Sequence, residues 1–198
     1  MGVLDGALDW VPVRRRLGID AFGVNGYRAA RAGDVIIEDH VESPGQQEAY
    51  MVVRGRARLT VGGHDLDLGP GEIAFVADPD QRRGGVALED ETALLAIGGW
   101  TDQPYHSLPW EPIYLTQQLM ARGEWSEAAA TLEREAGTHR DSAIVHFRMA
   151  CCFAQAGEHE RALVELGAAL EARPGMAEMA VSDPLLEPLR ARDDWPVG

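Results

Sequence analysis

The feature of this sequence that most constrains its fold is a change in the spacing of apolar residues near residue 105. Before that point, short apolar runs rich in Val, Ile and Leu are separated by Gly, Pro and Asp turns. After it, Ala, Leu, Glu and Arg dominate with helical spacing. Alternation with a period of two is typical of strands, and a spacing of three to four residues is typical of helices. We therefore expect a β domain over 1–105 and a helical domain over 106–198. Many short strands with regular turns favour an antiparallel jelly-roll barrel for the first domain.

The run that begins at Gln47 carries the strongest candidate for a functional side chain. Alternation along this run places Glu48, Tyr50 and Val52 on one face of a strand. The opposite face is also apolar, so we expect the strand to lie between two sheets. An ionised carboxylate in such an interior is costly unless it is paired, hydrogen-bonded or bound to a metal. Glu48 is therefore predicted to have a partner, and any chemistry is expected around it.

The overall charge and the absence of lysine exclude several classes of function. The formal net charge is −14, whereas binding to a nucleic-acid backbone needs a basic surface. Every cationic side chain other than histidine is Arg. Schiff-base chemistry, lysine-anchored pyridoxal phosphate and a Walker phosphate loop all need a lysine amine. These three kinds of site are excluded.

The two cysteines and the apolar runs bear on where the protein is found. Cys151 and Cys152 are adjacent inside a helical pattern, which indicates buried thiols rather than a disulfide framework. The first residues lack the basic region and apolar core of a signal peptide. No apolar run approaches the roughly 18 residues needed to span a bilayer. We expect a cytoplasmic protein without membrane contact.

The second half contains an internal repeat. The motif that begins at Gly123 returns at Gly157, and Ala128 and Leu132 recur at the same offset, as Ala162 and Leu166. This offset matches the length of a tetratricopeptide unit, which is about 34 residues. The second half therefore resembles about two tetratricopeptide hairpins, followed by a short helix near Pro184. Such hairpins imply a surface for a protein partner.

The first half resembles the cupin superfamily over roughly residues 20–100. Gly33, Glu48 and Gly55 match the glycine, glutamate and glycine of that family's first motif, with the six-residue gap before Gly55. Pro70-Gly71-Glu72 matches the turn of its second motif. The joining of a cupin to tetratricopeptide-like helices also resembles a group of actinobacterial proteins. The resemblance implies a β-barrel and, because cupins often pair through barrel edges, a homodimer.

The family's metal ligands, two histidines and a glutamate followed by a third histidine, are only partly present. Residues 41–44 stand where the first two histidines are expected, with His40 slightly early. Arg82 stands where the last is expected, and its charge would repel a cation there or pair with Glu48. A metal site would then consist of His40, Glu42 and Glu48, a set that suits manganese or iron and, more weakly, zinc.

Three functions remain open at this point. The first is a protein that binds a small molecule through Glu48, Tyr50, Arg82 and His40 without transforming it; the molecule would be anionic if Arg82 contacts it. The second is a metal-dependent dioxygenase or isomerase, in which Tyr50 would serve as acid or base. The third is a scaffold whose helices are the working surface. The sequence identifies neither the ligand nor the partner.

Overall fold

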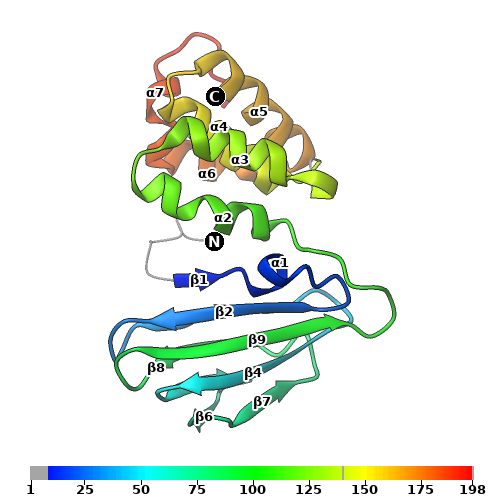
Figure 1. Cartoon of the computed structure of the whole chain (residues 1–198). Helices are drawn as coiled ribbons and strands as arrows, with labels where there is room; N and C mark the ends of the chain where they lie inside the picture. Colours follow the sequence, from blue (N-terminus) through cyan, green and yellow to red (C-terminus); the bar gives the residue numbers. More distant parts are fainter. Residues whose placement is uncertain (1–8, 140, 198) are drawn as a thin grey trace. The chain divides into compact units, whose positions relative to one another are not determined.

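The computed structural model describes residues 9–139 and 141–197. These residues form two compact units, one ending at Ser107 and the other beginning at Leu108 (Figure 1). Each unit is described by itself. The N-terminal stretch that is expected to lack a signal peptide falls mostly on residues 1–8, outside the described residues.

The first unit is built from two antiparallel sheets and one short helix. A five-stranded sheet has the order β1-β2-β9-β4-β7 (Figure 1). A four-stranded sheet has the order β3-β8-β5-β6. The elements are β1 (Asp9–Val11), α1 (Val13–Leu17), β2 (Gly23–Ala29), β3 (Val35–His40), β4 (Gln46–Arg54), β5 (Ala57–Val61), β6 (His64–Leu68), β7 (Ile73–Val76), β8 (Arg83–Ala87) and β9 (Thr92–Trp100). No strand pairing connects the two sheets within the described ranges, so the closure of the predicted barrel is not seen. The arrangement is a two-sheet sandwich.

The inner faces of the two sheets share one hydrophobic core. Ile36 and Leu59 come from the four-stranded sheet, and Tyr50, Val52 and Leu94 come from the five-stranded sheet. Burial of each large apolar side chain contributes about 1.5–3 kcal/mol. The prediction that Glu48, Tyr50 and Val52 share the interior face of one strand agrees with the deep burial of Tyr50 and Val52.

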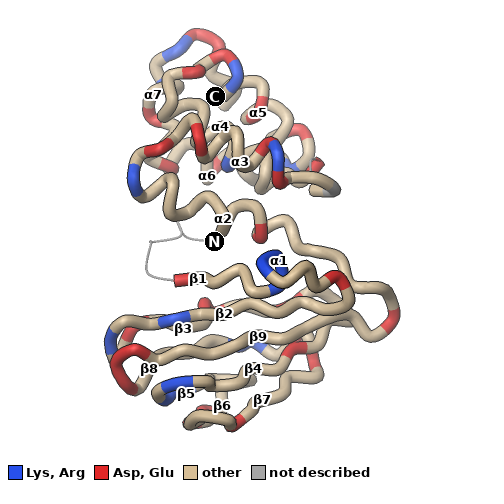
Figure 2. Tube along the Cα trace, in the orientation of Figure 1, with Lys and Arg blue, Asp and Glu red and all other residues tan. Residues whose placement is uncertain are grey.

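The outer face of β4 differs from the expectation that this strand lies between two sheets. Val53 on β4 is exposed, and so are Ile73 and Phe75 on the neighbouring β7. Strands β7 and β9 carry no charged residue (Figure 2). The apolar residues on the outer face of β4 and β7 therefore form an exposed surface, and no second sheet of the described residues covers them.

The second unit consists of short helix pairs followed by smaller turns of helix. Its elements are α2 (Trp110–Ala121), α3 (Trp125–Glu135), η1 (Gly137–His139), α4 (Ala143–Gln155), α5 (His159–Ala172), η2 (Pro174–Met176), α6 (Ala177–Ser182), η3 (Pro184–Leu186) and α7 (Glu187–Arg190). Helix α2 packs on α3, and α4 packs on α5. None of the described helices is long and apolar enough to cross a membrane.

The two helix pairs begin and end at positions that differ by the offset of the sequence repeat. Helices α2 and α4 end two residues before Gly123 and Gly157, and α3 and α5 begin two residues after these glycines. Each pair turns at its glycine with a positive φ, 73° at Gly123 and 79° at Gly157, a backbone conformation that glycine adopts without strain. The predicted last helix begins as η3, where the Asp183 side chain accepts a hydrogen bond from the Leu185 N–H group. Assignment of these helices to the tetratricopeptide class stays a prediction.

Both cysteines are buried in α4. Burial raises the pKa of the Cys151 thiol well above its usual range and raises the pKa of Cys152 to about 12. A thiol reacts through its thiolate form. The two side chains therefore act as small apolar core residues, as the sequence indicates.

Candidate functional site

The polar cluster of the β unit lies where the two sheets face each other. Strand β4 supplies Glu48 and Tyr50, and the end of β3 with the loop after it supplies His40 and Glu42. Strand β8 supplies Arg83, which stands directly opposite His40 in the register of the four-stranded sheet. The predicted residues His40, Glu42, Glu48 and Tyr50 are thus brought together.

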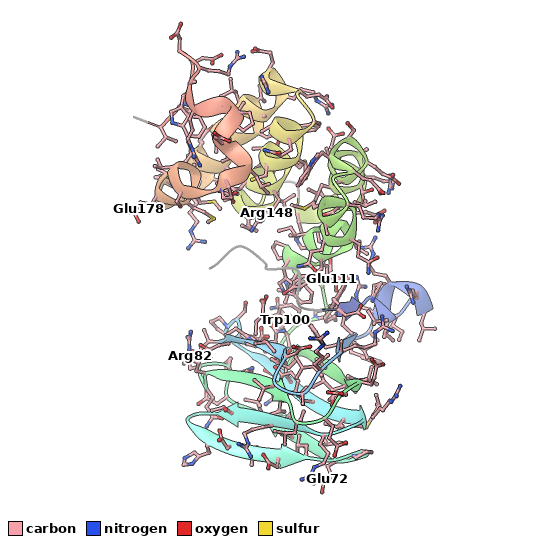
Figure 3. All side chains as sticks on the ribbon, turned by 90° about the vertical axis from the view of Figure 1, so that its left-hand side faces the viewer. Glu72, Arg82, Trp100, Glu111, Arg148 and Glu178 are labelled. Atoms are coloured by element: carbon pink, nitrogen blue, oxygen red, sulfur yellow. The ribbon has the colours of Figure 1, made fainter. Side chains whose placement is uncertain are left out.

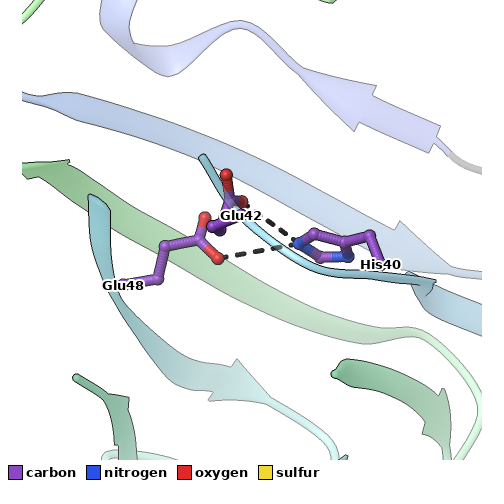
Figure 4. A group of neighbouring side chains, drawn as sticks. All are labelled: His40, Glu42 and Glu48. Atoms are coloured by element: carbon purple, nitrogen blue, oxygen red, sulfur yellow. Dashed lines mark hydrogen bonds and ion pairs between the residues drawn. The ribbon is translucent and has the colours of Figure 1, made fainter. Parts of the chain in front are cut away.

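The imidazole of His40 lies between three oxygen acceptors, two of which, the carboxylates of Glu42 and Glu48, are drawn in Figure 4. Its Nδ1 lies 2.7 Å from the Glu38 carbonyl oxygen. Its Nε2 lies 3.2 Å from Glu42 Oε1 and 3.7 Å from Glu48 Oε2. A carbonyl oxygen only accepts, so Nδ1 carries a hydrogen. Because Nε2 faces two carboxylates, a positive species must lie between them, either the second ring proton or a metal ion.

Glu48 has two further partners at the same oxygen. The Tyr50 hydroxyl donates to Oε2 at 2.5 Å, and Nη1 of Arg83 donates to it at 3.3 Å. The Arg83 side chain is only 1% exposed, and that of Glu48 is 13% exposed. Nε and Nη2 of Arg83 donate to three backbone carbonyls, those of Asp78, Pro79 and Gln81. Arg83 is therefore a fixed cation that joins Glu48 to the loop before β8.

The structure corrects the predicted position of Arg82. Its side chain is exposed at the periphery of the β unit, where its Nε donates to Asp39 Oδ2 at 2.7 Å (Figure 3). Successive residues of a strand point to opposite faces, and β8 begins at Arg83. The neighbouring Arg83 therefore enters the interior while Arg82 turns outward. Gly84 and Gly85 carry no side chain that alternates, so the sequence pattern does not indicate that a strand begins at Arg83.

The close contacts shift the pKa values of the cluster in opposite directions. Burial alone would raise the pKa of Glu48, but hydrogen bonding to His40 and Tyr50 holds it below its usual range. Burial raises the pKa of Glu42, partly offset by its hydrogen bond with His40. Burial and the charge of Glu48 raise the pKa of Tyr50 far above its usual range. Tyr50 therefore keeps its proton and donates to Glu48, which does not suit the predicted role as a base.

His40 is expected to be an imidazolium ion throughout the neutral range. Burial opposes the charge, but the contacts with Glu42 and Glu48 outweigh it and raise the pKa of His40 to about 10. The expected result is that the ring ¹⁵N shifts of His40 in the purified protein stay those of a doubly protonated ring from pH 6 to 8. Nuclear magnetic resonance of ¹⁵N-histidine-labelled protein measures this.

The raised pKa of His40 also makes the folding stability depend on pH. A folded pKa above the unfolded value of about 6.5 contributes stability that is complete below pH ~6.5 and is lost as pH rises through about 10. In Glu42→Gln one negatively charged acceptor becomes neutral, so the His40 ring is expected to titrate at lower pH than in the unchanged protein. A neutral His40 ring at pH 7 in metal-free protein would contradict this account.

The residues fit a divalent metal only in part. One imidazole nitrogen and two carboxylates place donor atoms within 4.8 Å of one another, a set that suits manganese or iron. The hydrogen bond of Nδ1 to a backbone carbonyl is the usual support of a metal-binding histidine. The guanidinium of Arg83 at 3.3 Å from Glu48 works against a second cation at that oxygen.

Two further polar side chains of the interior face were missed by the sequence prediction. Oδ1 of Asn25 and Oε1 of Gln46 are buried and accept no hydrogen bond from the described residues. A buried polar atom without a partner costs about 1–3 kcal/mol. Gln46 lies two residues before Glu48 on β4, so alternation alone could have placed it on the same face. Nothing in the sequence singles out Asn25.

No family model and no curated protein matches this chain. Solved structures similar to it over about half its length include cupin proteins. KdgF from Halomonas sp. is 16% identical with a TM-score of 0.40, and the match covers 54% of this chain and 86% of that one. A cupin protein from Bacteroides fragilis is 21% identical with a TM-score of 0.39, covering 55% and 88%. A sugar phosphate isomerase of the cupin superfamily from Silicibacter pomeroyi is 22% identical with a TM-score of 0.41, covering 52% and 73%. Similarity at this level does not carry function from those proteins to this chain.

Proposed function

We propose that the β unit binds a small polar molecule at the interior end that carries His40, Glu42 and Glu48, and that it does so without a metal ion. The observation that carries the proposal is the ion pair of Arg83 with Glu48, 3.3 Å apart and almost fully buried. This fixed guanidinium already supplies the positive charge that Glu48 needs in the interior.

The charges of the cluster balance without any added ion. Arg83 and an imidazolium at His40 oppose the carboxylates of Glu42 and Glu48. A divalent ion would displace the His40 proton and leave an excess of positive charge beside Arg83. Buried charges are stable when they are paired and hydrogen-bonded. The balanced cluster therefore supports binding of a neutral or weakly charged molecule more than binding of a metal.

Access to this end is on the His40 side. The His40 side chain is 33% exposed, whereas Arg83 is closed off from solvent. The anionic ligand of the sequence prediction rested on Arg82, which turns outward to Asp39. Arg83 does not replace it, because its side chain is closed off from solvent and its Nε and Nη2 already donate to backbone carbonyls, while Nη1 donates to Glu48. The proposal therefore no longer requires an anion.

Ligand-induced thermal stabilisation of the full chain tests this function. A ligand that binds only the folded state at 100 times its Kd adds about 2.7 kcal/mol to the unfolding free energy. We expect at least one class of small polar molecule to raise Tm in the presence of excess chelator, and His40→Gln to remove the shift. Arg82→Gln is the matched control and is expected to keep it. A shift that needs added metal, or no shift with any class, would contradict the proposal.

The second candidate is a metal-dependent enzyme, favoured by the three donors within 4.8 Å of one another. His40, Glu42 and Glu48 would hold the ion, which would supply Lewis-acid or oxygen-activating chemistry. Tyr50 would orient Glu48 through its hydroxyl, since its pKa is raised far out of the range of a base. The two candidates differ in whether the folded protein binds a metal ion.

The helical unit as a protein-interaction module stays a proposal supported by its repeat offset.

A further inference from the structure

We propose that the β unit has a second binding site, a cavity of about 280 Å³ at the end of the five-stranded sheet, and that it takes a small zwitterion, an α-amino acid with a short aliphatic side chain. The cavity lies at the opposite end of the sheet from Glu48. Ala93, which lines it, is five residues along β9 from Gly98, the partner of Glu48, or about 17 Å. This inference therefore stands apart from the proposed function.

One row of the sheet supplies the basic side chains of the cavity. Asp9 on β1 pairs with Arg28 on β2, which pairs with Ala93 on β9. Ala93 also pairs with Arg54 on β4. Alternation from the buried Val52 would turn Arg54 inward, but the register shift between them turns its side chain outward, where it is 69% exposed. The small side chain of Ala93 therefore separates two guanidinium groups.

The turns at the same end of the strands supply acidic side chains. Glu91 lies immediately before β9 and Asp34 immediately before β3, and both line the cavity. Hydrogen bonds hold both turns. The N–H group of Glu91 donates to the Ala30 carbonyl at 3.2 Å, and the N–H group of Arg31 donates to Asp34 Oδ2 at 2.9 Å. Groups of both signs therefore line one cavity on a fixed backbone.

Several of these charged groups have hydrogen-bonding capacity to spare. Nη1 of Arg54 lies 4.0 Å from Glu91 Oε2, which is an ion pair but too long for a hydrogen bond. Neither side chain makes a hydrogen bond with another residue of the described ranges, and within the same ranges Oδ1 of Asp34 has no partner. An exposed ion pair at such a distance contributes little stability. These donors and acceptors are therefore available to a ligand.

The backbone of Glu91 supplies an independent observation. Its φ is 55°, and every other residue with a positive φ in the described part of the chain is glycine. This conformation is costly for a residue with a side chain and easy for glycine. The exposed ion pair with Arg54 offsets little of that cost. A side chain kept in a strained position at the wall of a cavity points to a use for its carboxylate.

The charges of the cavity favour a zwitterion over an ion of one sign. Arg28 is neutralised by its ion pair with Asp9, which leaves the guanidinium of Arg54 and the carboxylates of Glu91 and Asp34. A plain anion would face both carboxylates, and a plain cation would face the guanidinium. A zwitterion avoids both conflicts. Its carboxylate accepts from Arg54 in a two-point contact, and its ammonium group donates to the two acidic side chains.

The uncharged part of the lining limits the rest of the ligand. Ala29, Ala30 and Ala93 offer methyl groups and no larger side chain. The volume lies just below the usual range of pockets for drug-sized ligands, which begins at about 300 Å³. A short aliphatic side chain beside the two charged groups matches this size and lining.

Isothermal titration calorimetry of the full chain at pH 7 and low ionic strength tests the site with L-alanine, propionate and ethylamine. The three share a carbon frame; propionate lacks the ammonium group and ethylamine lacks the carboxylate. We expect L-alanine to bind at one site per chain and the other two to bind at least tenfold more weakly. Arg54→Gln and Glu91→Gln are each expected to weaken L-alanine binding about tenfold or more, the effect of losing one hydrogen bond to a charged group. Glu89→Gln, an exposed neighbour outside the cavity, is the matched control and is expected to bind normally.

A stability measurement separates a ligand role of Glu91 from a structural one. Without ligand, Glu91→Gly is expected to leave Tm unchanged or to raise it by up to about 4 °C, because glycine removes the strain, while L-alanine binding is lost. A lowered Tm would show that the side chain serves stability and would overturn the inference.

The remaining outcomes keep this site distinct from the one at His40. His40→Gln is expected to bind L-alanine normally. Binding that is lost in His40→Gln and kept in Arg54→Gln would place the amino acid at the other end of the sheet and overturn the inference. Propionate or ethylamine binding as tightly as L-alanine would also overturn it. Absence of binding by all three compounds would do the same and leave the proposed function standing.

Discussion

Replacing Arg83 with methionine is expected to lower the free energy of unfolding by about 3–5 kcal/mol, since it leaves the carboxylate of Glu48 buried without its fixed cation. Three backbone carbonyls of residues 78–81 each lose a hydrogen bond from the guanidinium at the same time, although those of Asp78 and Pro79 still accept from backbone N–H groups. Methionine matches the length of the arginine stem, so packing changes little. Urea denaturation at pH 7, followed by tryptophan fluorescence, measures the loss.

The neighbouring arginine provides the matched control. Arg82 is exposed and pairs only with Asp39 among the described residues, so Arg82→Met is expected to change stability by no more than about 0.5 kcal/mol. Adding Glu48→Gln to Arg83→Met is expected to recover part of the loss, because the uncompensated charge disappears. Equal effects of the Arg82 and Arg83 substitutions would contradict the assignment of Arg83 to the interior.

Replacing Gly55 with alanine is expected to cost about 2–5 kcal/mol, the sum of a backbone cost and a packing cost. Gly55 has φ of 69°, and a left-handed backbone costs an L-residue about 1–2 kcal/mol. An added Cβ would also collide with Thr92 Oγ1 and lie 2.9 Å from Thr92 Cα. Thr92 cannot yield easily, because it is buried and its hydroxyl lies 2.7 Å from the Glu89 carbonyl oxygen, to which it donates, and 3.1 Å from that of Arg56. Overpacking of this kind adds about 1–3 kcal/mol.

Gly63→Ala separates the two contributions. Gly63 also has a positive φ, of 82°, but an added Cβ there meets no atom within 4 Å. This variant is expected to lose only the backbone part, about 1–2 kcal/mol. Denaturation curves of the two variants under the same conditions give the difference. A loss in Gly55→Ala no larger than in Gly63→Ala would show that the contact with Thr92 is not a constraint.

Period-two alternation predicted the part of the site that comes from continuous strand. Glu48, Tyr50 and Val52 alternate with residues of the outer face, and β4 has this regular pattern through Val52. The change of pattern near residue 105 likewise agrees with two units whose boundary follows Ser107. In both places one local rule acts over many residues, so single exceptions do not change the result.

The errors arose where the local rule is interrupted. The strand that contains Arg83 begins immediately before two glycines, and a shift of one residue exchanges Arg83 with Arg82. In β3, register shifts let both Ile36 and Ile37 enter the core, although alternation puts them on opposite faces. The pairing of His40 with Arg83 across two strands depends on contacts distant in sequence, which no local pattern can reveal.

The most direct test of the central claim is elemental analysis of untagged protein purified without chelator, after incubation with manganese, iron or zinc and removal of the excess. The balanced charges of Arg83, His40, Glu42 and Glu48 predict a folded protein that retains far less than one ion per chain. Near-stoichiometric metal that is lost in His40→Ala and in Glu48→Gln, with both variants still folded, would contradict the account and support the metal-dependent enzyme.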